Sequence, residues 1–205
     1  PGITFTEGDA TALPFEDNRF DVTISNTVSE HIAPAYFYGE QFRVLKPGGI
    51  CLVLSSRKGI HSTPEGIPFS DFDRQFWNKA EQYDNSMDKY SICKYPMNET
   101  ELPAAMEKYG FSDVQTGFVT VDLTPDNPRF SSSLAHDMIH ASRQTVLDRI
   151  DAVLHSMPDH FSSEEAEKMK QLTNEKFDVR IAQYERGEKL WDTDVSILMV
   201  IRGRK

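Results

Sequence analysis

Cysteine is scarce in this chain, and its placement excludes several kinds of site. The 205 residues contain only Cys51 and Cys93, which are far apart and form no CxxC spacing for metal binding or disulfide exchange. Two distant cysteines in an acidic chain fit a reducing compartment, so we expect a cytoplasmic protein. No apolar run approaches the ~18 residues of a membrane span. The N-terminus also lacks the basic and apolar regions of a signal peptide.

Basic residues are also few. The chain has 22 Lys and Arg against 32 Asp and Glu, which gives a formal net charge of −10. Phosphate backbones repel such a surface, and no Lys/Arg run forms a basic patch, so we do not expect nucleic acid as a partner. With 39% hydrophobic and 26% charged residues, the composition is that of an ordinary globular protein. Its length fits one domain with a sizeable core.

The first sixty residues alternate strand and helix signals. Ile3–Glu7 and Phe20–Ser25 are short and β-rich, and each is bounded by turn residues. The pattern predicts a helix over Pro34–Leu45, which Pro47-Gly48-Gly49 stops. Ile50–Leu54 is an unbroken apolar run, as in a central strand of a parallel sheet that is covered on both faces. Strand, helix and strand in this order predict a βαβ unit.

The second half of the chain predicts more helices and two last strands. A helix begins at Asn98 or Thr100 and ends at Gly110, and Pro103 in its first turn favours Thr100 as the cap. Between the last two strands, residues 126–192 form a helical insertion. The two strands are expected at Asp113–Leu123 and Val195–Arg202. The first long helix is expected at Ser133–His155. The second runs from the capping box Ser162-x-x-Glu165 to Gly187, with Phe177, Ile181 and Tyr184 on one stripe.

Five short motifs between residues 8 and 49 follow one another in a fixed order. Each is short enough to arise by chance, but five in the same order and spacing are strong evidence. They are Gly8-Asp9-Ala10, Leu13-Pro14-Phe15, Phe20-Asp21-Val22, Glu30-His31-Ile32 and Arg43-Val44-Leu45-Lys46-Pro47-Gly48-Gly49. In this quarter of the chain the sequence resembles class I S-adenosylmethionine-dependent methyltransferases, in particular those that act on small molecules.

The resemblance implies a fold and a cofactor. The fold class is α/β: a doubly wound, mostly parallel sheet of the seven-stranded, Rossmann-like type, here lacking its first strands. Residues 1–205 are then a single methyltransferase domain that contains the insertion 126–192. In such folds the ligand lies over the carboxyl ends of the strands. The implied S-adenosylmethionine-binding residues are Asp9 and Ala10 at the adenine, Ser25, Asn26 and Thr27 at the sulfur end, and His31 about one helical turn further on.

Two of these residues have a plain structural alternative. A carboxylate at Asp9 can accept from the exocyclic amino group of adenine, while the Ala10 N–H can donate to a ring nitrogen. Asp9 can equally be an ordinary turn residue after Gly8. His31 can be a packed histidine at the start of a helix.

The chain departs from the family in one important feature. None of its eleven glycines forms the G-x-G-x-G loop that follows the first strand, and the acidic residue after the second strand is absent too. We therefore expect an N-terminal truncation of about 50 residues, which would hold the first two strands and their helices. In the family's strand order Ile3–Glu7 would lie two empty places from Val22–Ser25. The missing segment itself, a re-paired strand or an element swapped from a second copy in a homodimer would fill that gap.

The residues that bind the methyl acceptor are less clear from sequence. The family often builds this pocket from the segment after the fifth strand and from the insertion. Segment 69–95 contains seven aromatic residues that could line an apolar pocket or simply plug the core. Methyl transfer depends mainly on positioning, so no catalytic base is assigned.

Two other functions and one other site fit parts of the sequence. A methyltransferase-like module that binds without catalysis is the alternative function, and the absent glycine loop keeps it open. A nicotinamide-dependent oxidoreductase shares the sheet but does not explain the motifs. His136 and His140 have a zinc-compatible spacing, but no third ligand is evident, so no metal site is predicted.

Overall fold

The structure is a computed structural model that describes residues 2–62, 69–84 and 92–205. The chain divides into two compact units. The first unit consists of Pro1–Lys58, Met87–Thr120 and Ile197–Lys205, and the second of Gly59–Ser86 and Val121–Ser196. None of the helices in the described ranges combines the length and the hydropathy that crossing a bilayer requires.

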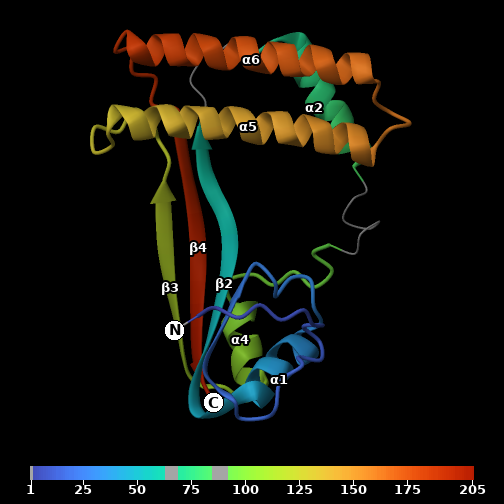
Figure 1. The fold of residues 1–205 in the computed structure, drawn as a ribbon, viewed down its shortest axis with the longest axis vertical. Helices are drawn as coiled ribbons and strands as arrows, with labels where there is room; N and C mark the ends of the chain where they lie inside the picture. The colour runs from blue at the N-terminus through green and yellow to red at the C-terminus, as the bar shows by residue number, and fades with distance from the viewer. Residues whose placement is uncertain (1, 63–68, 85–91) are drawn as a thin grey trace. The chain divides into compact units, whose positions relative to one another are not determined.

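The predicted α/β class is confirmed. Strands β1 (Phe20–Asn26), β2 (Leu45–Ser62), β3 (Ser112–Asp122) and β4 (Thr193–Arg204) form one sheet in the order β1-β2-β4-β3. Figure 1 labels β2, β4 and β3. β1 pairs in parallel with β2, and the register runs from Val22 opposite Ile50 to Asn26 opposite Leu54. Helix α1 (Pro34–Val44) connects the two strands, so the predicted βαβ unit is present. β2 is longer at both ends than the apolar run that predicted it.

The other helices are α2 (Asp71–Tyr83), α4 (Glu101–Lys108), α5 (Ser132–Ser156) and α6 (Ser163–Glu185). The two long helices between the last strands are confirmed, and α6 begins at the predicted capping box. Figure 1 shows α5 and α6 running side by side. α2 was not predicted, because no apolar period dominates its sequence. Ser70 and Asp73 nevertheless form a capping box that starts it.

The predicted strand at Ile3–Glu7 is wrong. Residues 2–8 have no regular structure, and the side chains of Ile3 and Phe5 are 84% and 91% exposed. Alternating β-rich residues form a strand only where a neighbouring backbone pairs with them. Among the described strands, none pairs with this segment.

The predicted cap of α4 also needs correction. Thr100 makes no side-chain capping hydrogen bond. Instead, Asn98 Oδ1 accepts from the backbone N–H groups of Thr100 and Glu101, at 2.9 and 3.0 Å. Asn is among the best residues for this role, because its short side chain reaches the free N–H groups of the first turn. Gly110, with a φ of +99°, follows the helix as predicted.

Each unit has its own apolar core. In the first unit α1, α4 and the strands bury Tyr38, Leu45, Leu102 and Met106, all at 0% exposure. In the second unit Phe76 and Ala80 of α2 join apolar residues of α5, α6 and the turn between these two helices.

The buried stripe of α6 differs from the predicted one. Phe177, Ile181 and Tyr184 are only half-buried, whereas Ala166, Met169, Thr173 and Arg180 are fully buried. The apolar period therefore missed the buried face of α6, because that face includes a charged side chain.

Candidate functional site

The motif Leu13-Pro14-Phe15 is hydrogen-bonded to Arg43, the first residue of the last motif. Glu40 and Arg43 of α1 hold the loop that follows Gly8-Asp9-Ala10. Glu40 Oε2 accepts from the Leu13 N–H at 2.7 Å, and Arg43 donates to the carbonyls of Leu13 and Phe15 at 3.0 and 2.7 Å. Arg43 also pairs with Glu40 and so holds the pKa of that carboxyl below its usual range. A charged pair on the helix thus fixes the path of the loop.

Asp9 lies in a short turn. Its Oδ1 accepts from the backbone N–H and the hydroxyl of Thr11, at 2.7 and 2.8 Å. These hydrogen bonds, led by the backbone one, lower the pKa of Asp9. The side chain is exposed and ionised, and Thr11 fixes its direction. This geometry suits a turn residue, and it leaves Oδ2 free of the Thr11 bonds.

Ser25, Asn26 and Thr27 lie where β1 ends. Asn26 stands opposite Leu54 in the register, and the Thr27 N–H donates to the Leu54 carbonyl at 2.9 Å. Thr27 has a positive φ of 52°, which turns the chain sharply away from the sheet. The three residues therefore occupy the carboxyl end of a parallel strand, where open α/β sheets bind their ligands.

A cavity of about 390 Å³ lies between this strand and α1 in the first unit. Ala10, Ser25 and Asn26 all line it, together with Phe37 and Gln41 of α1. Asp9, Thr27 and His31 are not among its lining residues. The structure therefore brings three of the six predicted cofactor residues around one space.

Two hydroxyls of β1 are unsatisfied. The Thr23 and Ser25 hydroxyl oxygens are buried and make no hydrogen bond within the described part of the chain. Both residues line the cavity. A buried hydroxyl without a partner is costly, by about 1–3 kcal/mol. A polar ligand in the cavity could supply the missing partners.

His31 has a different environment. Its Nδ1 accepts from the backbone N–H of Cys93 at 3.1 Å, and its Nε2 lies 3.8 Å from Glu30 Oε1. The ring is thus a structural link between the end of β1 and the segment before α4. The ring is exposed, and its Nδ1 is already used in a hydrogen bond within the protein.

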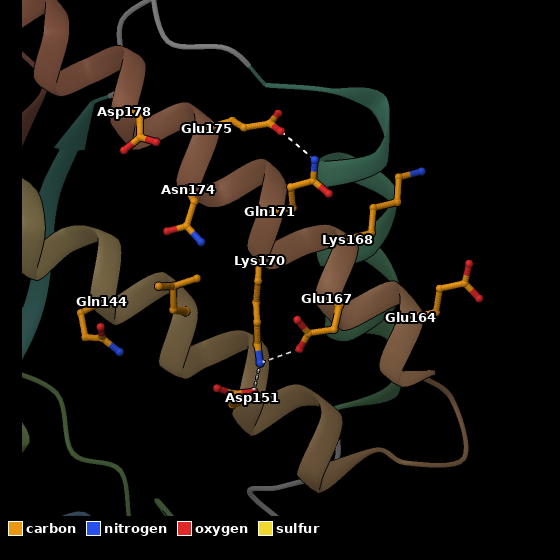
Figure 2. A pocket seen from close by; sticks show the side chains of 11 residues that line it. Gln144, Asp151, Glu164, Glu167, Lys168, Lys170, Gln171, Asn174, Glu175 and Asp178 are labelled. Atoms are coloured by element: carbon orange, nitrogen blue, oxygen red, sulfur yellow. Dashed lines mark hydrogen bonds and ion pairs between the residues drawn. The ribbon is translucent and has the colours of Figure 1, made fainter.

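A larger cavity lies elsewhere. It is a groove of about 820 Å³ between α5 and α6 in the second unit, lined almost entirely by polar side chains. Figure 2 shows that several of these side chains pair with one another. Lys170 binds Asp151 at 2.7 Å and Glu167 at 3.1 Å, and Gln171 donates to Glu175. Because its polar groups serve the two helices, we assign this groove no ligand.

Metal ligands do not gather in the described part of the chain. No group of three or more His, Cys, Asp or Glu side chains there is arranged to hold an ion. His136 packs its ring edge-on against Tyr184, with the ring centres 5.2 Å apart.

Comparison with known proteins points to the same N-terminal region as the sequence motifs. Residues 1–53 match the family described as a methyltransferase domain. The chain is 29% identical over 136 residues to sterol 24-C-methyltransferase erg6 of Schizosaccharomyces pombe. This alignment covers 60% of this chain and 30% of that protein. It is 34% identical over 119 residues to the ubiquinone/menaquinone biosynthesis C-methyltransferase UbiE of Ruegeria sp., covering 55% and 47%. The chain thus spans less than half the length of either relative.

Solved structures are more distant. The YcgJ protein from Bacillus subtilis aligns with a TM-score of 0.43 and 18% identity, over 98% of this chain and 70% of that one. The resemblance to class I S-adenosylmethionine-dependent methyltransferases is confirmed, and it rests on the matched residues 1–53 and the curated relatives.

Sequence reasoning missed the residues that position the site. The sequence places both Glu40 and Arg43 in a predicted helix, and Arg43 also in the last motif, but indicates no role for either in the site. Their spacing of three residues on a predicted helix is a signal for an ion pair. It could not have shown that the partner is a loop about 27 residues earlier.

Proposed function

We propose that this protein transfers a methyl group from S-adenosylmethionine to a small-molecule acceptor. The observation that supports it most is the cavity where Ala10, Ser25 and Asn26 come together, inside the segment that matches the methyltransferase family. The unsatisfied hydroxyls of Thr23 and Ser25 fit a polar ligand in this space.

The residues have distinct roles in this proposal. Ala10 and the Asp9 carboxylate would bind the adenine, and the strand end at Ser25, Asn26 and Thr27 would bind the methionine portion. His31 would contact the cofactor from the neighbouring turn. When bound, the cofactor supplies an electrophilic methyl group. The protein's part is to hold the acceptor in line with that group and to exclude water, so no general base is assigned.

Location and assembly are also proposals. The net charge of −10 and the cysteine usage support a cytoplasmic protein that does not bind nucleic acid. We keep residues 1–205 as one methyltransferase domain in which 126–192 is an insertion. A homodimer is the remaining expectation.

A matched pair of substitutions tests the cofactor site. Ala10→Leu should fill the cavity, whereas Ala12→Leu adds the same side chain to the same turn at an exposed position that does not line it. By calorimetry, S-adenosylmethionine affinity should fall at least about tenfold in the first variant and stay unchanged in the second. Asp9→Ala should weaken binding several-fold. Equal affinity in all four proteins would remove this cavity from the site.

Catalysis needs a separate measurement. Labelled methyl transfer can be followed with a sterol and with a quinone precursor, the acceptor classes that the relatives' names suggest. Product formation would support the enzyme. Cofactor binding without transfer to any acceptor would favour the alternative, a methyltransferase-like module that binds without catalysis.

The acceptor site is the least constrained part of the proposal. We propose that segment 69–95 and the insertion cover it; residues 85–91, which include Tyr90, lie outside the described residues. Phe76 is buried, and Trp77 packs against it. The Arg149 guanidinium lies over the Trp77 ring, 4.7 Å from its centre. Part of this aromatic cluster therefore serves the core. If the segment covers the acceptor, Trp77→Ala should raise the acceptor's KM more than it changes cofactor affinity.

A further inference from the structure

The second unit contains a smaller cavity of about 250 Å³ with a mixed lining. It lies between α5 and α6 on one side and the chain near His61 and Asp194 on the other. Ile139, Val146 and Phe177 give it apolar walls, and Lys176 of α6 supplies a cation. An apolar space with a few polar groups is the usual form of a small-molecule site.

Lys176 has no ion-pair partner in the part of the chain that the structure describes. Burial lowers the pKa of Lys176, and the charge of the Asp73 carboxylate partly offsets this effect. Asp73 is already committed to the capping box of α2, where its Oδ2 accepts from the Ser70 N–H at 2.9 Å. Phe69 lies near the ammonium, at 5.5 Å from its ring centre, and contributes no charge. The ammonium is thus half-buried and only partly compensated.

A second donor on the same helix is also incompletely used. Arg180 lines the cavity and is only 2% exposed. Its Nε and Nη2 donate to Asp192 and Asp126, but its Nη1 is buried and makes no hydrogen bond within the described residues. A buried N–H group without an acceptor is unfavourable, and an oxygen of a ligand would relieve it.

Of the two acids that line the cavity, Asp192 is paired, whereas Asp194 Oδ1 makes no hydrogen bond within the described residues. Both oxygens of Asp192 accept from Arg180, and Asp194 Oδ1 lies 2.9 Å from His61 Nδ1. An anion would find a cation without a partner.

We propose that this cavity binds a small organic anion with a compact apolar body. Its carboxylate or phosphate group would pair with the Lys176 ammonium, with the Arg180 Nη1 group as a further donor, and its apolar part would pack against Ile139 and Phe177. This inference goes beyond methyl transfer and does not depend on the cofactor cavity. Its failure would therefore leave the proposed function untouched.

Three probes of similar shape test the charge requirement on the full chain. Phenylacetate, phenyl phosphate and uncharged 2-phenylethanol can be titrated by calorimetry or by changes in the protein's NMR spectrum. At least one of the two anions should bind about tenfold or more tightly than the alcohol. Preference for phenyl phosphate would identify the natural anion as a phosphate, and preference for phenylacetate would identify it as a carboxylate.

Variants on the same two helices provide the controls. Lys176→Met keeps the length of the side chain and should weaken the anion about tenfold or more. Lys168→Met makes the same change on α6 in the groove of Figure 2, outside this cavity, and should leave affinity unchanged. Ser142→Phe fills the mouth from an exposed position of α5 and should abolish binding while Lys176 remains. Equal binding of the alcohol, or wild-type affinity in Lys176→Met, would overturn the proposal.

Discussion

Arg180 binds Asp192 through two hydrogen bonds, from Nε to Oδ2 at 3.0 Å and from Nη2 to Oδ1 at 2.6 Å. Nη2 also donates to Asp126, whose Oδ2 accepts from the backbone N–H groups of Leu190 and Trp191 as well. Asp126 and Asp192 mark the two ends of the segment between the last strands. One buried guanidinium therefore ties together the beginning and the end of that segment.

Loss of this guanidinium should destabilise the second unit strongly. Arg180→Met leaves two carboxylates, one of them fully buried, without their cation, and such a loss costs about 3–5 kcal/mol. The free energy of unfolding from urea titration measures it. Arg186→Met removes an exposed cation that pairs with Glu188 on the surface, and it should change stability little. Similar effects of the two substitutions would contradict this account of the Arg180 cluster.

Arg43 should matter for cofactor binding although it does not line the cavity. Arg43→Met removes the hydrogen bonds to the Leu13 and Phe15 carbonyls, so the loop that carries Asp9 and Ala10 loses its anchor. We expect S-adenosylmethionine affinity to fall several-fold, together with a lower unfolding temperature.

Lys46→Met is the matched control for Arg43. Lys46 pairs with the exposed Asp21 on the surface and does not contact the loop. It should therefore leave cofactor affinity at the wild-type value. If cofactor affinity fell in Lys46→Met but not in Arg43→Met, the loop would not be positioned by Arg43.

Asp122 should make stability depend on acidic pH. The Thr124 backbone N–H, and then Asn127 and Arg129, favour its charged form and lower its pKa from the usual 3.8. A lowered pKa in the folded state adds stability that is complete above about pH 4 and is lost as the pH falls through the folded value. Asp122→Asn should therefore lose less stability than the wild type between about pH 5 and pH 2. Parallel pH profiles for the two proteins would refute this role.

Gly203 of β4 should tolerate no side chain. A Cβ there would lie 2.5 Å from Met106 Sδ and 2.9 Å from Phe111 Cβ in the core of the first unit. Gly203→Ala should therefore reduce the free energy of unfolding by about 1–3 kcal/mol. Gly117→Ala in β3 meets nothing within 4 Å and should cost no stability. Both can be measured by urea titration.

The sequence predicted the regular elements where their signals were local. The apolar run 50–54, the capping box at Ser162 and the glycine at 110 each act within a few residues, and β2, α6 and the end of α4 follow from them. Prediction failed where the outcome depends on distant partners. Ile3–Glu7 has a strand pattern but no paired neighbour, and α2 has a cap but no clear apolar period.

The candidate site shows the same limit of local signals. The family resemblance implied Ala10 at the adenine and Ser25 and Asn26 at the sulfur end of one cofactor, and all three line one cavity. The resemblance could not reveal that His31 contacts Cys93, or that Arg180 is buried, because both depend on chain segments far away in the sequence. A charged residue on a helix predicts an exposed position unless its partners are known.

The buried thiol of Cys51 gives the first unit an internal reporter of its own opening. Burial raises the pKa of this thiol to about 11, and its Sγ donates to Gln41 Oε1 at 3.3 Å inside the core. Alkylating reagents attack the thiolate, so in the closed state this sulfur is protected both by its protonation and by its neighbours. Cys93 is half-exposed. In a labelling time course, modification at Cys93 therefore measures reagent access, and the later modification at Cys51 measures how often the core beneath β1 and α1 opens.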